Sequence, residues 1–419
     1  MIEGPAKKAE STPMTSGSQD KLKLLMVSGM FPSVEHAGGL RLYDILQDLA
    51  ARHEVHLYSV FQESLDRASL EKLRPLLASI RLVPEAQFQI DDLDAWLKRS
   101  ALAPEDFSAV LLEYPHSTAL AESLKKRGAR LFFTFMESVT RRKAIDFGLS
   151  VTTQPEKLPA IAKDLLDCFL TERKAMIHCE STIALTPADA DYVESTFNAG
   201  RPHVVATGIS PIFLAEASPV PAELGELGRS AIFVGYFDHY PNNEGMEWYL
   251  KNVHAQVLAA VPDFKLYVVG RGDTTRLKTL AQGQNSVVFV GRVESIAEWI
   301  EKARICISPL ISGAGFRGKL NQYSALGRPT VSTGIGACGL PYVHGESVFK
   351  ADDPAEFADA MIKLLLDDAL WHDMQEKGKR VVDRHFGWPN LVQKLETIYR
   401  GKPQPRNEKS FAIESHHTH

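Results

Sequence analysis

Two cations, Arg317 and Lys319, directly follow a run of small residues, Ser312-Gly313-Ala314-Gly315. Glycines let a backbone approach a ligand closely. Arginine and lysine donate charge-assisted hydrogen bonds to phosphate oxygens, and the amides at a helix N-terminus favour an anion. The stretch therefore predicts a cradle for a diphosphate. The alternative is an ordinary strand–loop–helix turn that carries basic residues by chance.

The elements around these cations would place them at the edge of a sheet. An apolar run at 305–307 predicts a strand before the loop, and 320–326 predicts a helix after it. Gly327 and Pro329 end that helix, and a further apolar strand starts at 330. Ligands of open α/β sheets gather at the carboxyl ends of strands, so we expect the site there.

The first half of the chain offers weaker candidates in the same kind of position. Gly38-Gly39 precede a helix predicted over 40–52, and they either admit a phosphate or sugar or supply a positive φ. His116 follows the predicted strand 109–113 and is either a site residue or a hydrogen-bonded loop histidine. Glu137 follows the strand 130–135, beside the cations at 141–143. It is either catalytic, acceptor-binding or part of a surface ion-pair cluster.

The composition is that of a globular protein with more than one core. The chain has 419 residues, of which 44% are hydrophobic and 24% charged, and a net charge of -5 that gives no indication of nucleic acid as a partner. Its four cysteines show no metal-like spacing, which favours a reducing compartment. No apolar run reaches the roughly 18–20 residues of a membrane helix, and no secretion signal is apparent. We therefore expect a cytoplasmic protein.

Predicted strands alternate with helices in both halves, which indicates an α/β protein with two doubly wound, Rossmann-like parallel sheets facing across a cleft. We expect a disordered tail over 1–20 and a first domain over 21–210. A linker rich in proline and glycine would span 211–229, and a second domain 230–385. A last helix would lie within 386–400, and a flexible tail would cover 401–419.

Several of these stretches together resemble glycosyltransferase family 4. The segment SGAGFRGKLNQYSALGRPTVSTGIGACGL, with ADDPAEFADAMIKLLLDD after it, is similar to the donor-binding region of that family. FVGYFDHYPNNEGMEWYL, VVGRGD and FVGRVESIAEWIEKARICISPL match upstream in order and spacing, so the resemblance covers roughly 230–400. VSGMFPSVEHAGGLRLYDILQDLA is similar to the first strand, glycine loop and helix of the family.

The resemblance implies the two-domain GT-B fold, with RHFGWPNLVQKLETIYR as a crossover helix that returns to the first domain. It implies a retaining, metal-independent enzyme that moves a sugar from a nucleotide-diphosphate donor to a glycan or glycolipid acceptor. No cofactor and no metal ion are implied, because the nucleotide sugar is a substrate. Such relatives usually work in bacterial surface polysaccharide assembly, which places an acceptor at the inner face of the membrane and allows peripheral contact with it.

The resemblance also gives individual residues a role. Arg317 and Lys319 match the basic pair that holds the donor diphosphate, and both are expected to take part in catalysis together with His116 and Glu137. Further donor contacts are expected from the glycine loops, the base-binding stretch and the residues beside them: Gly38, Gly39, Gly291, Arg292, Val293, Gly313, Ala314, Gly315, Phe316 and Gln322.

This sequence departs from the family at the sugar contacts. Most members carry a pair of glutamates where Ala314 and Gln322 stand, and an amide binds a ribose hydroxyl more weakly than a carboxylate does. The usual histidine of the first domain is missing from FTFMES, where Thr134 stands, and His116 is a candidate replacement. These departures support an alternative: a catalytically degenerate GT-B protein that binds a sugar nucleotide or glycan as a partner or regulatory subunit. A sugar-nucleotide epimerase is a third possibility.

Overall fold

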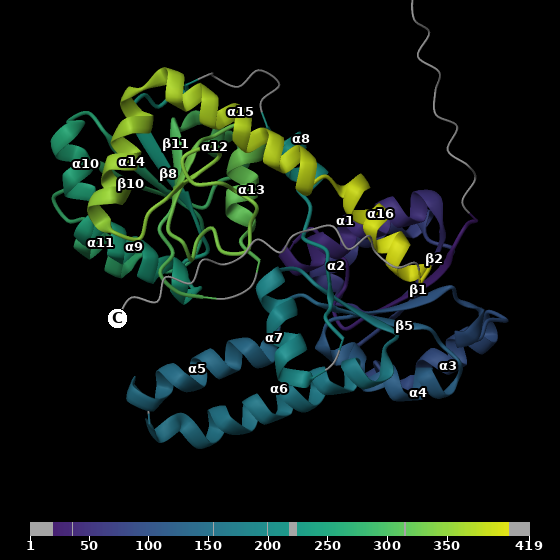
Figure 1. Ribbon diagram of the computed structural model, residues 1–419. Coiled ribbons are helices and arrows are strands. Elements are labelled where there is room, and N and C mark those ends of the chain that lie inside the picture. Colours follow the sequence, from purple (N-terminus) through teal and green to yellow (C-terminus); the bar gives the residue numbers. More distant parts are fainter. Residues whose placement is uncertain are drawn as a thin grey trace, which may run out of the picture.

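The computed structural model describes residues 20–35, 37–153, 155–198, 200–217, 224–313 and 316–401. These residues form two domains, each built on a parallel sheet with helices on both faces (Figure 1). The predicted doubly wound α/β fold is confirmed. The two expected tails lie almost wholly outside the described residues, as does the middle of the expected linker, whose first residues form a short helix, α8 (Pro211–Ala215).

Within the described residues, the first sheet has seven parallel strands in the order β3-β2-β1-β4-β5-β6-β7. Neighbouring residues of a strand point to opposite faces, so Leu24 and Met26 enter one core while Leu25 and Val27 enter the other. The strands are β1 (Lys23–Ser28), β2 (Glu54–Val60), β3 (Ser79–Val83), β4 (Ala109–Glu113), β5 (Leu131–Phe135), β6 (Ser181–Ala184) and β7 (His203–Val204).

The helices of the first domain cover the two faces of this sheet. One face packs against helices α1, α2 and α16, and the other packs against α3, α4, α6 and α7. Their bounds are α1 (Ala37–Arg52), α2 (Glu63–Leu73), α3 (Ile90–Arg99), α4 (Ala121–Lys126), α5 (Val139–Thr153), α6 (Leu158–His178), α7 (Pro187–Phe197) and α16 (Trp388–Tyr399). Short 3-10 turns are η1 (Arg74–Leu76), η2 (Glu85–Gln87), η3 (Pro104–Asp106), η4 (Pro115–Leu120) and η5 (Pro155–Lys157).

The second sheet repeats this plan with six parallel strands among the described residues, in the order β10-β9-β8-β11-β12-β13. Its strands are β8 (Ser230–Val234), β9 (Lys265–Val269), β10 (Val287–Gly291), β11 (Ile305–Ser308), β12 (Thr330–Ser332) and β13 (Phe349–Lys350). The surrounding helices are α9 (Tyr240–Asn252), α10 (His254–Ala260), α11 (Thr275–Leu280), α12 (Ile296–Lys302), α13 (Gly318–Ala325), α14 (Pro354–Leu366) and α15 (Asp368–His385).

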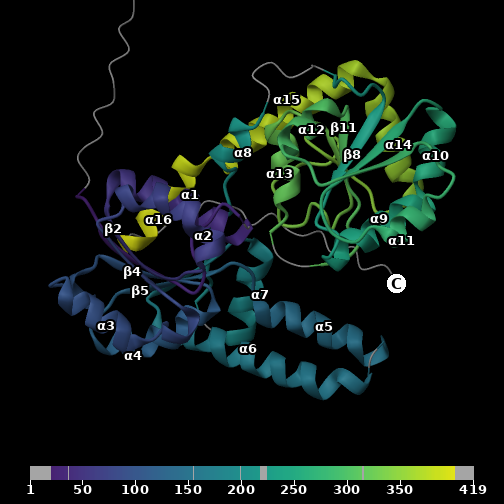
Figure 2. The same cartoon turned by 180° about the vertical axis from the view of Figure 1, so that it is seen from behind.

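Helices α5 and α6 form a hairpin that projects from the first domain (Figures 1 and 2). The sequence predicts a helix near α6, but it does not predict α5, whose first turns carry three cations where the helix dipole disfavours them. Glu172, buried on α6, compensates at this helix end. Its Oε1 accepts a hydrogen bond from the Val139 amide at 2.6 Å, and its Oε2 accepts one from Ser138 Oγ at 3.1 Å.

The chain crosses between the domains twice, and the two crossings are bonded to each other. The Ile209 amide donates to the Phe386 carbonyl oxygen at 3.0 Å. Asp44 on α1 accepts from Ser210 Oγ and from Trp388 Nε1, each at 3.2 Å. The second crossing leads into α16, which packs against α1 of the first domain. Within the described part of the chain, no helix is both long and apolar enough to span a bilayer.

Candidate active site

Each sheet has one topological switch point, where successive strands turn to opposite sides. The switch lies between β1 and β4 in the first domain and between β8 and β11 in the second. Crevices outside the carboxyl ends of such strands are the usual ligand sites of doubly wound sheets. Arg317 and Lys319 lie beyond β11 at the second switch point, and Gly38, Gly39 and His116 lie near the first.

Lys319 is held inside the second domain. Its Nζ donates a hydrogen bond to Asn242 Oδ1 and lies 4.5 Å from the centroid of the Phe233 ring on β8. Burial, with a smaller contribution from the nearby charge of Arg317, lowers the pKa of Lys319 to about 7. The Lys319 amino group is thus partly buried and oriented by two contacts, and its neutral fraction gains a proton when an anion approaches.

Asn242 fixes the direction of this contact. Its Nδ2 donates to the Tyr236 carbonyl oxygen at 2.7 Å, so its Oδ1 must point toward Lys319. Asn242 lies in the first turn of α9, directly after Pro241, and is buried. We did not predict a role for this residue from the sequence, because an asparagine early in a helix is an ordinary capping residue.

Arg317 stands at the N-terminal end of α13 and is tied to the loop before it. Its Nη2 donates to the Gly313 carbonyl oxygen at 2.6 Å, and its Nε donates to that of Ile335 at 3.3 Å. Gly313 has a φ of 100°, a conformation that favours glycine, and a Cβ there would lie 3.1 Å from Pro241. Burial lowers the pKa of Arg317, but a guanidinium keeps its charge.

Charged residues of the first domain lie close enough to Arg317 and to His239 to act on them electrostatically. The charges of Arg141, Asp189 and Glu137 act on Arg317, and those of Glu137 and Arg142 act on His239, which precedes α9. Burial first, and then the charges of Lys319 and Arg317, lower the pKa of His239. The sequence analysis did not single out His239, although it follows strand β8.

The three cations at 141–143 form ion pairs, each with a different carboxylate. Arg142 Nε lies 2.9 Å from Glu137 Oε1, Arg141 Nη1 lies 3.0 Å from Asp189 Oδ1, and Lys143 Nζ lies 3.2 Å from Asp164 Oδ2. Glu137 and Arg142 are both partly exposed, and the charges of both act on His239 of the second domain. A catalytic role for Glu137 stays a prediction.

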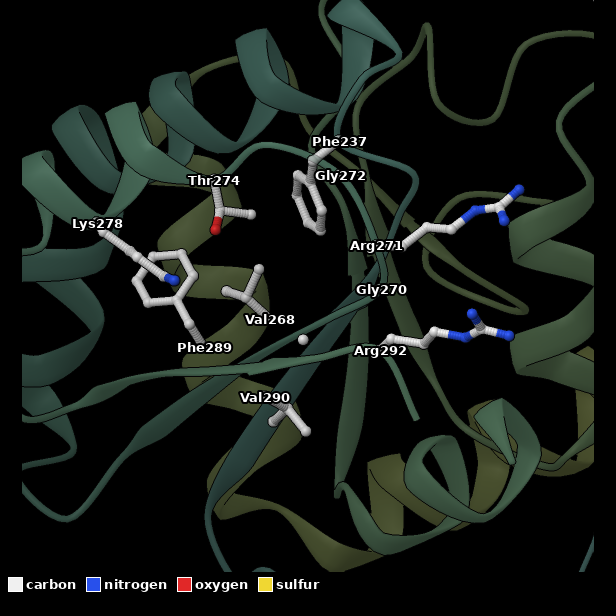
Figure 3. A pocket seen from close by; sticks show the side chains of 11 residues that line it. Phe237, Val268, Gly270, Arg271, Gly272, Thr274, Lys278, Phe289, Val290 and Arg292 are labelled. Carbon is white, nitrogen blue, oxygen red and sulfur yellow. The ribbon is translucent and has the colours of Figure 1, made fainter. Parts of the chain in front are cut away.

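A cavity of about 370 Å³ opens at the carboxyl ends of β9 and β10 (Figure 3). Figure 3 shows apolar side chains from adjacent strands lining it, with cationic side chains around its mouth. The lining residues are Phe237, Val268, Gly270, Arg271, Gly272, Thr274, Lys278, Phe289, Val290, Gly291 and Arg292. Such a cavity suits a flat, mostly apolar ring system.

Three residues were predicted to hold the nucleotide base, and two of them line this cavity. Gly291 has a φ of 80°, and a Cβ built on it would meet open space. Arg292 lines the cavity too, whereas Val293 does not and packs instead against the hydrophobic core that includes Ile300.

The cavity and the two cations are joined by a pair of aromatic rings. Phe237 lines the cavity, and its ring centroid lies 6.0 Å from that of Phe233. Phe233 in turn lies beneath the Lys319 ammonium group. The cavity and the cation pair are therefore neighbouring features of the same edge of the second sheet, connected through buried rings.

The position of the glycine pair in the first domain differs from the predicted one. Gly38 and Gly39 lie within the first turn of α1 rather than in the loop before it. A Cβ on Gly38 would lie 1.9 Å from Tyr114 Oη, so only glycine fits beside this tyrosine. Tyr114 itself has a φ of 69°, which is strained for a residue other than glycine.

His116 lies at the carboxyl end of β4 and is exposed. A Cβ on Gly29 would lie 2.8 Å from the His116 Cβ, so the histidine packs against the loop after β1. It has no hydrogen-bonding or charged partner among the described residues, and its role stays a prediction. Thr134, where the family histidine was expected, donates to Glu113 Oε1 at 3.0 Å, and both side chains are buried.

Of the remaining residues predicted to contact the donor, Gln322 and Phe316 are described by the structure and Ala314 and Gly315 are not. Gln322 lies one helical turn after Lys319 on α13 and is partly buried. The Phe316 ring centroid lies 6.2 Å from that of Phe386, so Phe316 contacts the second crossing between the domains. Ala314 and Gly315 lie outside the described residues. Over the described ranges, no cluster of three or more histidine, cysteine, aspartate or glutamate side chains could hold a metal ion.

Comparison with known proteins agrees with this geometry. Residues 228–367 match the family described as glycosyl transferases group 1. The chain is similar to a phosphatidyl-myo-inositol mannosyltransferase of Mycobacterium leprae, with 28% identity over 200 residues, which are 46% of this chain and 52% of that protein. The chain thus spans about half the length, or less, of the curated relatives it matches.

Solved structures share the fold over nearly the whole chain. Sucrose-phosphate synthase from Thermosynechococcus elongatus has a TM-score of 0.64 at 16% identity and covers 90% of this chain and 98% of its own. HepE from Anabaena, solved in complex with UDP, has a TM-score of 0.68 at 13% identity and covers 91% and 100%. These likenesses show the two-domain GT-B fold.

Proposed function

Because residues 228–367 are a glycosyl transferases group 1 domain within a GT-B fold, we propose that this protein is a retaining, metal-independent glycosyltransferase of family 4. It would move a sugar from a nucleotide-diphosphate donor to a glycan or glycolipid acceptor. The observation that carries the proposal is that two features lie at the same carboxyl edge of the second sheet: the cation pair of Arg317 and Lys319, and the 370 Å³ cavity at the ends of β9 and β10.

The cation pair suits the departure of a nucleoside diphosphate. When the bond between the sugar carbon and the β-phosphate oxygen breaks, its electron pair stays on the phosphate. Arg317, Lys319 and the first amides of α13 would stabilise that charge in a buried setting, where such contacts typically supply a few kcal/mol each. The acceptor hydroxyl oxygen forms the new bond to the sugar carbon, and its proton passes to the oxygen of the departing β-phosphate. Closure of the domains would exclude water from this step.

The names of similar proteins support both substrates. The mycobacterial relative is named for mannosyl transfer to phosphatidyl-myo-inositol, a lipid. Structures of HepE are described with UDP and with UDP-glucose. We therefore assign the donor to the nucleotide sugars and favour an acceptor of bacterial surface polysaccharide assembly, presented at the inner face of the membrane to a cytoplasmic enzyme.

The test is a panel of nucleotide sugars added to the pure protein with and without EDTA. We expect one donor to raise the unfolding temperature and to be hydrolysed slowly, with EDTA changing neither result. Stabilisation without turnover, even with candidate acceptors, would favour the degenerate binding protein instead. If no nucleotide raised the unfolding temperature, both readings would be wrong.

A further inference from the structure

Helix α6 carries a solvent-facing side that the proposed reaction does not use. Leu166, Leu170 and Ile177 are 55%, 46% and 58% exposed, which is unusual for three large apolar residues on one helix. Lys163, Arg173 and Lys174 are exposed as well. These six positions recur at intervals of three and four residues, so they share one side of the helix. We call this side the α6 face.

The buried side of α6 confirms this orientation. Glu172 and Ala175 are almost fully buried, and they lie on the opposite side from the α6 face. The long hairpin of α5 and α6 projects from the first domain in both views (Figures 1 and 2). The rest of the described chain leaves about half of each of these three apolar side chains uncovered.

The cations of the α6 face are unpaired, in contrast to those of α5. Over the described residues, Lys163, Arg173 and Lys174 form no ion pair with any carboxylate, whereas each of the three cations of α5 does. Two carboxylates border the face without forming an ion pair with it: Asp167 on α6, and Glu122 on α4, whose pKa is lowered first by Lys126 and to a smaller extent by Lys174. An exposed helix side that interleaves free cations with large apolar residues fits an anionic, partly apolar surface.

A second copy of the chain is the main competing occupant. The spacing of 163, 166, 170, 173 and 177 is that of a coiled-coil seam, in which apolar residues would pack against a partner helix. Lys163 and Arg173 occupy two of these positions. Pairing two such helices would bury both cations without a carboxylate partner, which is costly. An anionic surface meets the same cations with opposite charge.

We propose that the α6 face binds the surface of an anionic lipid bilayer, with Leu166, Leu170 and Ile177 entering the headgroup region and the three cations contacting lipid phosphates. The helix would lie parallel to the membrane, as interfacial amphipathic helices do. This inference deepens the membrane setting given under the proposed function by naming the surface that makes the contact, although the attachment itself needs neither donor nor acceptor.

The experiment is co-sedimentation of the full chain with vesicles of phosphatidylcholine alone or with 30% phosphatidylglycerol. We expect binding to the anionic vesicles only, weakening as salt is raised. The triple variant Lys163→Glu, Arg173→Glu, Lys174→Glu should bind them roughly 100-fold or more weakly, because each surface cation typically contributes about fivefold. Leu166→Gln with Leu170→Gln should also weaken binding.

A matched triple variant, Lys72→Glu, Lys98→Glu, Lys251→Glu, is the control. It changes the net charge equally but alters exposed cations on α2, α3 and α9. It should bind like the unaltered chain, and all variants should keep its unfolding temperature. The proposal would be overturned if the two triple variants lost vesicle affinity equally. It would also be overturned if the chain bound neutral and anionic vesicles equally well, or bound neither. A dimer in solution that the α6 variants convert to monomers would likewise overturn it, because the face would then serve a second copy.

Discussion

At the second switch point, Arg317 and Lys319 are positioned to bind an anion in two different ways. Arg317 is fixed by backbone carbonyl groups of two loops, while Lys319 is fixed by Asn242 and by the ring of Phe233. One cation therefore keeps its charge at every accessible pH, and the other gains its full charge when the ligand arrives. This difference makes the donor site sensitive to pH.

Donor affinity should weaken as pH rises above 7. Lys319 in the empty site has a pKa of about 7, below its ordinary 10.5, and a bound diphosphate would raise it again. Binding at pH 8 should therefore take up close to one proton, and the Kd of a nucleotide-diphosphate sugar should rise by up to about tenfold per pH unit. His239 has a pKa lowered from 6.5 and stays neutral over this range.

Calorimetry in buffers of different ionisation enthalpy measures the proton uptake directly. Lys319→Met should bind more weakly and show no such uptake. An unaltered chain that binds without proton uptake between pH 7 and 9 would contradict the buried, partly neutral lysine.

Asn242 should matter to donor binding more than its neighbour Asn243 does. Both side chains tie the loop after β8, through the carbonyl groups of Tyr236 and Phe237, but only Asn242 contacts Lys319. Asn242→Ala should lower donor affinity roughly 10-fold or more, the usual effect of losing a hydrogen bond to a charged group. Asn243→Ala is the control, and an equal loss in both would mean that loop order alone is responsible.

Arg317 and Lys319 were predictable from the sequence because residue type, glycine content and neighbouring elements coincide in one short stretch. Asn242, Phe233 and Phe237 were not, because they come from the preceding strand and helix and meet the cations only in the folded sheet. The same holds for the cavity, to which three separate strand ends contribute.

At the level of elements, the α5–α6 hairpin depends on one buried acid. Ser138 caps the start of α5 by accepting a hydrogen bond from the Arg141 amide at 3.2 Å, and Glu172 in turn accepts hydrogen bonds from Ser138 and from the Val139 amide. Burial raises the pKa of Glu172, and these hydrogen bonds oppose that shift. Helix α5 was missed in the sequence analysis because its first turns carry three cations, and the buried acid that supports them comes from a different helix.

Glu172→Ala should destabilise this hairpin by about 1–3 kcal/mol, because two buried donors lose their acceptor. Urea unfolding should show the loss, and amide hydrogen exchange should accelerate at 139–141. Glu172→Gln keeps an acceptor oxygen and should cost less. If exchange at the start of α5 were unchanged in Glu172→Ala, the capping role would be wrong.

For the whole molecule, Asp44 connects the first domain to both crossings of the chain. Burial raises the pKa of Asp44 to about 7, and the hydrogen bonds from Ser210 and Trp388 lower it. Gly208 adds to this junction, since a Cβ there would lie 2.7 Å from the Trp388 ring. Both described crossings of the chain between the domains thus pass through this junction.

Asp44→Asn should change how stability depends on pH. The pKa of Asp44 is about 7 in the folded chain and 3.8 in the unfolded chain. The stabilising contribution of the protonated Asp44 side chain is therefore fully present below pH 3.8 and is lost as the pH rises to about 7. An asparagine can accept from Trp388 and donate to Ser210 without titrating. Relative to the native chain, the variant should gain up to about 1.4 kcal/mol per pH unit between pH 5 and 7, with no further gain above.

Urea unfolding at pH 5, 6, 7 and 8 measures this difference. Asp44→Ala, which removes both hydrogen bonds, should be less stable than the native chain across the range. A constant difference between Asp44→Asn and the native chain would show that Asp44 does not titrate at the junction.

The overall architecture was predictable because alternating strands and helices allow few arrangements, and buried parallel strands such as Leu24 to Val27 give continuous apolar runs. The arrangement of the two domains was not, because it depends on contacts such as those of Asp44 with Ser210 and Trp388, which lie far apart in the sequence. The α6 face was missed for a related reason: exposure is decided by which elements cover a helix.

A crystal structure of the protein with a bound nucleoside diphosphate tests the central claim most directly. We expect the phosphates on Arg317 and Lys319, and the base in the cavity beside Phe237, Phe289 and Gly291. A nucleotide bound elsewhere, or one in the cavity with its phosphates turned away from both cations, would contradict the account.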